Sequence, residues 1–370
     1  MTPRPNWLPD ETQEHLLQAA TAPEAATAAN AWKRWNDLTT LDDVQTQSFN
    51  LLPLVYRNLT NLGVNGQDID RLRGVYRYTW SRNQLLMSTG ARAIRTLNRG
   101  AIETLVLKGG ALNLLQFNDL GVRPMADFDL LVPREAAREA ISLLLGNGFR
   151  ERPDYPGPEL RLTVHHSAPM RDEDGRELDL HWYSLWQSAP DEEFWEAALP
   201  IRIGDEATVA LCPTDQLLHV IAHGTYWDRT TAIGWIADAA KIVRGAREEV
   251  HWDRFTDEAR RRGLAGSVCA PLSYLRERFG VPVPLGVLTD LRRGRTDLLG
   301  KAAARTDRNE TNRMRVLLML FDRYRRLRRF DPAAPRPSSF PAYVARWFGY
   351  DSTLSFSLDA GKRLVGIRRS

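Results

Sequence analysis

The stretch Arg123-Pro124-Met125-Ala126-Asp127-Phe128-Asp129-Leu130-Leu131-Val132 decides how this chain folds and where its chemistry lies. Its second half is apolar apart from Asp129, which predicts a buried strand. Successive side chains of a strand point to opposite faces, so Asp127 and Asp129 share one face and Phe128 points into the core. Two carboxylates on one face repel each other, and a divalent cation removes that cost. Most isolated Asp-x-Asp pairs lie on solvent-exposed edges and bind no metal. The neighbouring segments must therefore decide between a solvated pair and a metal site.

Segments on both sides of this strand favour a site for phosphate chemistry. A short β-type run at residues 104–107 ends at Lys108-Gly109-Gly110, and a short helix is expected at residues 111–117. Glycines let a backbone approach phosphate closely, and a helix N-terminus offers free N–H groups. Further along, Asp179 lies in an apolar run, where a carboxylate needs a cation. Two aspartates on one strand and a third on a neighbour suit two-metal phosphoryl transfer.

The surrounding residues predict a compact α/β unit. Residues 134–145 have the apolar spacing of a helix, which Gly146-Asn147-Gly148 ends. A β-hairpin is expected from residues 162–165 and 177–182, because an Asp174-Gly175 turn lies between two alternating runs. We therefore expect a small mixed sheet with helices.

Helical segments flank this unit in the sequence. We expect an N-terminal helical segment at 1–100, an α/β core at 101–210, a C-terminal helical domain at 211–330, and a Pro-containing linker with a basic tail at 331–370. The segment Arg313 to Phe330 is amphipathic, with Leu317, Phe321 and Tyr324 predicted to dock on the helical body. Its arginines are expected to stay available to an anionic partner.

Composition and charge describe an ordinary globular chain with a basic C-terminal region. The sequence is 43% hydrophobic and 26% charged, and it has no apolar run of transmembrane length. Because residues 1–7 lack the apolar core of a secretory signal, no such signal is expected. Two cysteines indicate free thiols in a reducing compartment, so the expected location is cytoplasmic. Residues 291–370 hold 19 Lys and Arg against 7 Asp and Glu. This excess indicates either a solvated arginine-rich face or an anionic partner, which would be a polyanion such as nucleic acid, a membrane surface, or the acidic remainder of the chain.

Three motifs in order, Leu107 to Leu112, Arg123 to Val132 and Leu178 to Trp182, resemble the uncharacterised bacterial nucleotidyltransferase family of the polymerase-beta-like superfamily. The resemblance extends over residues 40–250. It implies an α+β fold with a polymerase-beta-like nucleotidyltransferase core between N- and C-terminal helical segments. The chain departs from the common pattern at Gly110, where a serine often contacts phosphate, and in the 16 residues between Gly110 and Asp127.

The resemblance also implies roles for individual residues. Asp127 and Asp129 would bind both metal ions, Mg²⁺ or Mn²⁺, and Asp179 would hold the catalytic ion and help activate the acceptor. Binding of the nucleoside triphosphate would fall to four further residues: Gly109 and Gly110 would cradle it, and Lys108 and Arg123 are candidates for phosphate contacts.

The activity implied is metal-dependent transfer of a nucleoside monophosphate from a triphosphate, with ATP the expected donor, to an acceptor hydroxyl with release of pyrophosphate. The acceptor stays open between a small molecule, a peptide or protein, and RNA. Two alternatives also stay open: a non-catalytic nucleotide- or nucleic-acid-binding protein on the same fold, and a toxin-like enzyme that modifies tRNA or protein.

Histidines and tryptophans elsewhere give weaker signals. His219 and His223 are four residues apart on a predicted helix, but the glutamate of a His-Glu-x-x-His metalloprotease site is missing, so they are expected to line a groove or the core. His181 shares a strand face with Asp179 and is expected near the site. Trp186 is expected to serve packing, and stacking on a nucleotide base is the alternative.

Overall fold

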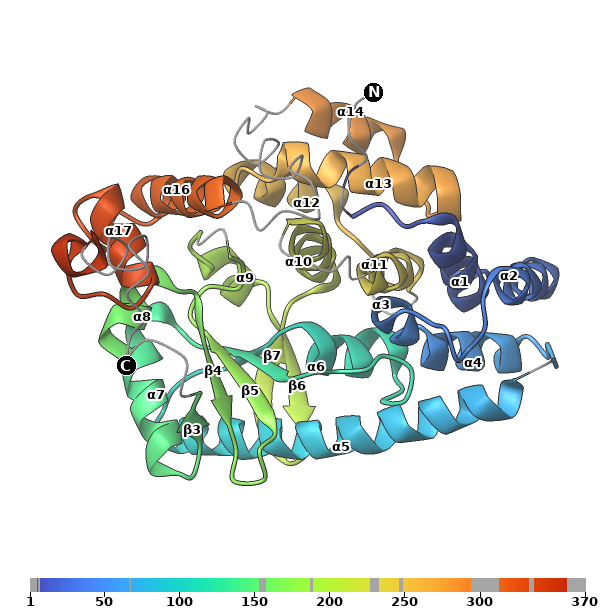
Figure 1. The fold of residues 1–370 in the computed structure, drawn as a ribbon, viewed down its shortest axis with the longest axis horizontal. Coiled ribbons are helices and arrows are strands. Elements are labelled where there is room, and N and C mark those ends of the chain that lie inside the picture. Colours follow the sequence, from blue (N-terminus) through green and yellow to red (C-terminus); the bar gives the residue numbers. More distant parts are fainter. Residues whose placement is uncertain are drawn as a thin grey trace, which may run out of the picture.

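The computed structural model describes residues 5, 7–66, 68–152, 158–186, 189–226, 233–245, 249–293, 313–332 and 336–357. A mixed sheet lies at the centre, and the long helix α5 (Ile69–Arg99) runs along one of its faces (Figure 1). Helices from both ends of the sequence gather over the other face. The predicted α+β class is therefore confirmed.

The sheet has seven strands in the order β3-β4-β5-β2-β1-β7-β6. β1 pairs antiparallel with β2 and parallel with β7, and β2 pairs parallel with β5, while the remaining pairs are antiparallel. The strands are β1 (Leu105–Val106), β2 (Phe128–Leu131), β3 (Arg150–Glu151), β4 (Ser167–Arg171), β5 (Glu177–His181), β6 (Leu199–Ile203) and β7 (Glu206–Ala210). The predicted strands at 104–107 and 128–132 thus form neighbours at the middle of the sheet.

Alternation along the central strands separates two hydrophobic clusters. Phe128 and Leu130 of β2 belong to the cluster that includes α5, whereas Leu131 belongs to the cluster on the opposite face with the N- and C-terminal helices. Phe128 is fully buried, as predicted. Asp129 lies between Phe128 and Leu130 in sequence, so its side chain points to the face opposite α5.

Contacts from α5 fix the position of β2 and of the loop before it. A Cβ at Gly90 would lie 2.4 Å from the Phe128 ring, so this glycine gives the ring its place against α5. The fully buried Asn83 donates to the carbonyl oxygens of Leu120 and Arg123 and accepts from the Met125 N–H. Every polar atom of that amide is used to hold the segment that leads into Asp127 and Asp129.

The other helices cover the sheet or extend the helical layer. They are α1 (Glu11–Thr21), α2 (Ala25–Leu38), α3 (Thr46–Phe49), α4 (Leu52–Asn61), α6 (Lys108–Leu112), which continues into a π-helix (Asn113–Phe117), α7 (Ala137–Gly146), α8 (Pro158–Val164), α9 (Glu192–Glu196), α10 (Pro213–Tyr226), α11 (Gly234–Arg244), α12 (Trp252–Arg261), α13 (Ala265–Phe279), α14 (Leu285–Arg293), α16 (Arg313–Phe330) and α17 (Phe340–Trp347). None of the helices in these described segments is both long and apolar enough to cross a bilayer.

The predicted hairpin is wrong in its first strand. Residues 162–165 belong mostly to helix α8, and the strand that pairs with β5 is β4, around a turn in which Gly175 has a φ of 78°. Leu162 and Val164 alternate as in a strand, but so short a run is decided by packing. Arg161 of α8 is fully buried and bound to Glu151, which favours the helix.

The predicted docking face of α16 is also partly wrong. Tyr324 is buried as expected, but Leu317 and Phe321 are 38% and 37% exposed. The helix instead buries Arg323 and Arg326, which are fully or almost fully inaccessible. Part of the predicted basic tail, residues 333–335 and 358–370, lies outside the described residues.

Candidate active site

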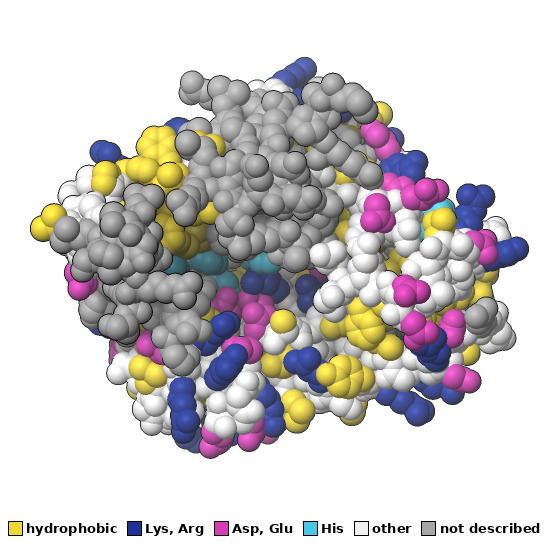
Figure 2. All heavy atoms as spheres, in the orientation of Figure 1, with side chains coloured by type: hydrophobic (Ala, Val, Ile, Leu, Met, Phe, Trp, Pro, Cys, Tyr) yellow, Lys and Arg dark blue, Asp and Glu magenta, His cyan; other side chains and the backbone are white. Residues whose placement is uncertain are grey.

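The two acidic strands bring their carboxylates together by register. Asp129 of β2 lies directly opposite Asp179 of β5 in the parallel ladder, and Leu131 lies opposite His181. The period of two places Asp129, Asp179 and His181 on the face opposite α5. Figure 2 shows histidine, acidic and basic side chains gathered in a hollow on this side of the molecule.

His181 binds both aspartates through one nitrogen. Its Nε2 lies 3.0 Å from Oδ1 of Asp129 and 3.1 Å from Oδ2 of Asp179. Burial alone would lower the pKa of His181, but the charge of Asp179 and hydrogen bonds to both carboxylates raise that pKa to about 9. The imidazole is therefore positively charged at neutral pH and donates to the carboxylates. The expectation that His181 lines the site is confirmed.

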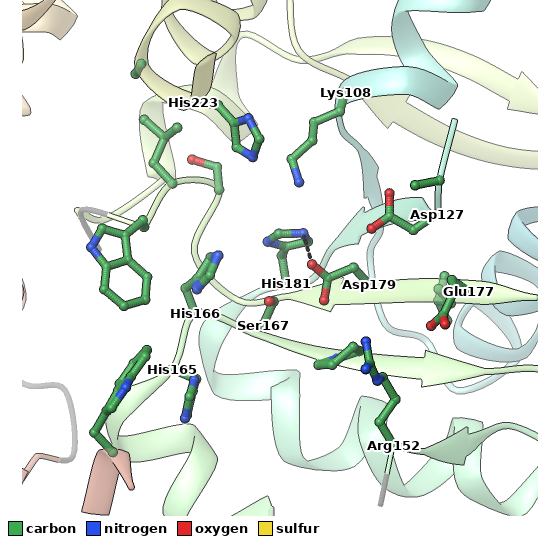
Figure 3. Close-up of a pocket in the computed structure, with 18 residues that line it drawn as sticks. Lys108, Asp127, Arg152, His165, His166, Ser167, Glu177, Asp179, His181 and His223 are labelled. Atoms are coloured by element: carbon green, nitrogen blue, oxygen red, sulfur yellow. Dashed lines mark ion pairs between the residues drawn. The ribbon is translucent and has the colours of Figure 1, made fainter. Parts of the chain in front are cut away.

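Lys108 supplies a second positive charge. It begins α6 with a φ of 44°, which is uncommon for a residue with a side chain, and its Nζ lies 2.5 Å from Oδ1 of Asp129. Burial works against its charge, but Asp129, Asp127 and Asp179 together raise the pKa of Lys108. Figure 3 shows the side chain pointing from the start of α6 toward His181 and Asp127.

The pKa values of the three carboxylates are not all shifted in the same direction. Burial opposes ionisation of Asp129 and Asp179, but Lys108 and His181 outweigh it, so the pKa values of both lie below the usual range. Asp127 has the opposite shift, because the charge of Asp129 and then burial raise its pKa to about 7. Repulsion among the aspartates is thus concentrated on Asp127.

The arrangement fits a divalent cation. Asp129, Asp179 and His181 each offer one ligand atom, and these atoms all lie within 4.8 Å of one another. Oδ1 of Asp179 is buried and has no hydrogen-bond partner in the described structure. Carboxylates and an imidazole are ligands for Mg²⁺, Mn²⁺ or Zn²⁺, with carboxylate-rich sets favouring the first two. Asp127 is not part of this trio.

Tight packing accounts for the glycines at the start of α6. A Cβ at Gly109 would lie 2.6 Å from Met125 and 2.8 Å from the guanidinium of Arg123, and one at Gly110 would lie 2.9 Å from Val106. Both glycines are buried. Their small size therefore allows α6 to pack on the central strands, whether or not phosphate binds there.

Arg123 lies apart from the carboxylates. Its Nε is 2.9 Å from both carboxylate oxygens of Asp238, which is almost fully buried on α11. This ion pair lines a second cavity of about 310 Å³ together with Trp235. Among the predicted site residues, the structure thus brings Lys108, Asp127, Asp129 and Asp179 together and places Arg123 at the neighbouring cavity.

The carboxylates of Asp127 and Asp179 line a cavity of about 460 Å³. One end holds Asp127, Asp179 and Glu177, and the other holds aromatic and imidazole rings, as the labelled side chains in Figure 3 show in part. Lys108 and His223 line this cavity and the smaller one, so the two cavities adjoin at these side chains. His219 is buried with Nε2 2.9 Å from the Ser184 carbonyl oxygen, which confirms a groove or core position for both histidines.

Four lining residues of the aromatic end were not assigned to the site from the sequence: His165, His166, Trp186 and Trp347. Trp186 was expected to serve packing, with base stacking as the alternative, and the His165-His166 pair matched no motif. Trp347 gave none, because it reaches the cavity from α17, far along the chain.

The comparison with protein families agrees with this geometry. A model described as uncharacterised nucleotidyltransferase matches residues 35–280. The chain belongs to this nucleotidyltransferase family. The match covers the sheet, the carboxylates and both cavity-lining histidines of α10, so the chain is a transferase enzyme and the predicted resemblance is confirmed. Among curated proteins, no match was found.

Proposed function

We propose that this nucleotidyltransferase transfers a nucleoside monophosphate from a nucleoside triphosphate, with ATP the first candidate donor, to a hydroxyl group of an acceptor. The reaction depends on Mg²⁺ or Mn²⁺. The observation that supports the proposal is the pair Asp129 and Asp179, which lie directly opposite each other on adjacent strands. Lys108 is bound to Asp129, and Asp127 is close enough to raise the pKa of this lysine.

The metal ligands would be Asp129 and Asp179, joined by Asp127 on the triphosphate side and by Nε2 of His181 after loss of its proton. A divalent ion supplies charge neutralisation at the transferring phosphoryl group. In the structure Lys108 and His181 provide the positive charge that lets Asp129 and Asp179 stay ionised while buried. The same residues can therefore hold the carboxylates in place before substrates bind.

The transfer itself exchanges one phosphorus–oxygen bond for another. The acceptor hydroxyl oxygen bonds to the α-phosphorus, and the bond from that phosphorus to the oxygen bridging to the β-phosphorus breaks, releasing pyrophosphate. The hydroxyl proton passes to the carboxylate of Asp179, which lines the larger cavity. Lys108 binds phosphate oxygens as a point charge at the start of α6. Positioning and electrostatics supply most of the rate enhancement.

A label-transfer assay tests this activity. Each of four α-³²P-labelled triphosphates is incubated with the enzyme and a cell extract as the acceptor pool, with Mg²⁺, with Mn²⁺ or with EDTA. We expect labelled product with a metal ion and none with EDTA or with Asp129→Asn. Asp70→Asn is the matched control, because Asp70 is 82% exposed on α5, far along the helix from the described carboxylates. Label transfer that persists in EDTA, or that survives Asp129→Asn, would overturn the proposal.

A further inference from the structure

The aromatic end of the larger cavity is formed by segments that are distant in sequence. The ring of Trp347 stacks on His165 with centroids 4.0 Å apart and lies edge-on to Trp186 at 4.9 Å. His166 contacts Trp186 on another side, with centroids 5.5 Å apart. Together these four side chains make a continuous aromatic wall around one end of a cavity whose other end holds Asp127 and Asp179.

Buried contacts hold this wall in place. Arg323 of α16 lies over the Trp186 ring at 4.4 Å and donates hydrogen bonds to the carbonyl oxygens of Val164 and Trp186. Its Nε also lies 2.9 Å from the hydroxyl of Tyr343, which itself donates to the Val164 carbonyl oxygen. Because Arg323 and Tyr343 are almost fully buried, α17 and the end of α8 form one packed unit with the cavity wall.

The wall carries no described charge of its own. Burial, with help from Arg323, lowers the pKa of His165 to about 3, so the imidazole is neutral under ordinary conditions. Indole rings and neutral imidazoles favour planar, uncharged groups over phosphates. This end therefore differs in chemistry from the carboxylate end of the same cavity.

The adjoining smaller cavity suits the triphosphate better. It is lined by Lys108 and Arg123. The acidic side chain among its described lining residues, Asp238, forms an ion pair with Arg123. A triphosphate lying along Lys108 at the border of the two cavities would reach Asp127 from this side. The donor nucleotide is then accommodated without the aromatic end, which is left for the second substrate.

Resting on the transfer reaction proposed above, we infer that the aromatic end binds the acceptor, and that this acceptor carries its hydroxyl on a planar, uncharged aromatic group. The hydroxyl points along the cavity to Asp179. Trp347 determines which acceptors fit. It lies on α17, outside the residues 35–280 that match the family, so acceptor choice is set in part by a segment beyond the shared core.

Binding of β-naphthol, a planar hydroxyl compound, tests the inference. Affinity is measured by calorimetry with wild-type enzyme in the presence and absence of magnesium and the non-reacting analogue AMPCPP. We expect β-naphthol to bind, its saturated analogue decahydronaphthol to bind much more weakly, and AMPCPP not to displace it. Trp347→Ala should weaken β-naphthol by about tenfold, the loss of one aromatic contact and its burial, and leave AMPCPP affinity unchanged.

Phe348→Ala is the matched control, because Phe348 is the next residue, is 50% exposed and does not line the cavity. If Trp347→Ala has a lower melting temperature than wild type, His165→Ala provides a second test, because His165 directly follows α8 and contributes to the wall from a different segment. Unchanged β-naphthol affinity in both variants, absence of binding to the wild type, or competitive displacement by AMPCPP would overturn the inference; displacement would instead make the wall a base site. Failure of AMPCPP to bind at all would refute the proposed activity, which separates the two outcomes.

Discussion

The ammonium nitrogen of Lys108 lies 2.5 Å from Oδ1 of Asp129, at a carboxylate that is only 3% exposed. A partly buried lysine and a buried aspartate each depend on the other for their charge. Nε2 of His181 approaches the same oxygen, so two cations compensate Asp129, while Asp127 has the smaller share of this compensation. The acidic residues of the site should consequently respond differently to mutation.

Asp127→Asn should abolish nucleotidyl transfer and stabilise the metal-free protein. The folded pKa of Asp127, about 7, lies above its value in the unfolded chain, so the native state binds more protons between these values. The proton on Asp127 is bound in the folded state at low pH, and the stability that it contributes is lost as pH rises through about 7. The variant should therefore melt about 2–4 °C above wild type at pH 8 in EDTA, with a smaller gain near pH 4.5. Equal gains at both pH values would show that Asp127 does not carry the repulsion.

Asp129→Asn should have the opposite effect on stability. An expectation drawn from repulsion alone is that removing any one carboxylate relaxes the site. This substitution would leave the partly buried Lys108 and the buried His181 without their shared counter-charge. Breaking a buried ion pair lowers the free energy of unfolding by about 3–5 kcal/mol, and the loss here should be at most of that size. Chemical denaturation in EDTA measures this change.

The double variant Lys108→Met with Asp129→Asn serves as the control for that experiment, since it removes a buried cation together with the carboxylate. Stability of the double variant should recover much of the loss. If Asp129→Asn alone is as stable as wild type, the ion pair with Lys108 contributes little and the site is more hydrated than its burial indicates.

Lys108→Met should strengthen binding of Mn²⁺ in the absence of nucleotide. Lys108 occupies one oxygen of Asp129 that a metal ion would use, so its removal frees that ligand and removes a repelling charge. The same change should weaken binding of AMPCPP by about tenfold, because a charged contact to phosphate is lost. Mn²⁺ titration followed by electron paramagnetic resonance, and calorimetry with AMPCPP, give the two values. Weaker Mn²⁺ binding in the variant would mean that Lys108 organises the carboxylates and does not compete with the ion.

Asp179→Ala should reduce turnover more than triphosphate affinity. Asp179 lies on β5 and lines only the larger cavity, whereas Arg123 lines only the smaller cavity proposed for the triphosphate and Lys108 lies at the border of the two. We expect a fall in kcat of at least about 10²-fold, the usual contribution of a general base, with AMPCPP affinity within about threefold of wild type. Parallel losses of rate and affinity would assign Asp179 to nucleotide binding.

Local sequence patterns predicted which carboxylates share a face of the sheet but not the cavity around them. Alternation in Phe128 to Leu131 was enough to place Asp129 on one face of its strand, because a period of two is a local property. The position of Asp129 directly opposite Asp179 depends on the pairing of β2 with β5, which only the structure gives. The approach of Trp347 to His165 depends on how α8 and α17 pack, which no local pattern records. The positive φ of Lys108 was not predicted either, because no local pattern marks a residue other than glycine for this conformation.

Helix α16 shows the same limit at the basic C-terminal region. Its hydrophobic spacing predicted that Leu317, Phe321 and Tyr324 form the docking face. The helix instead buries Arg323 and Arg326 together with Tyr324 and leaves Leu317 and Phe321 partly exposed. Arg326 is bound to Asp322 and to the Arg262 carbonyl oxygen, so it serves the fold. A periodicity argument treats every arginine as outward-facing and misses such buried pairs.

Replacing the exposed arginines of α16 tests whether this region binds a polyanion. Arg325, Arg328 and Arg329 are exposed, and their change to Gln should leave the melting temperature unchanged. If the partner is RNA, retention on immobilised RNA should fall as salt rises and should fall further in the triple variant, because each neutralised phosphate releases counterions. Arg326→Gln is the contrasting variant: it should lower stability by about 1–3 kcal/mol through loss of a buried charged hydrogen bond, with little effect on the salt slope. If the wild-type protein shows no salt-sensitive retention on RNA or on anionic vesicles, these arginines do not bind a polyanion. They would then serve only to keep the surface solvated.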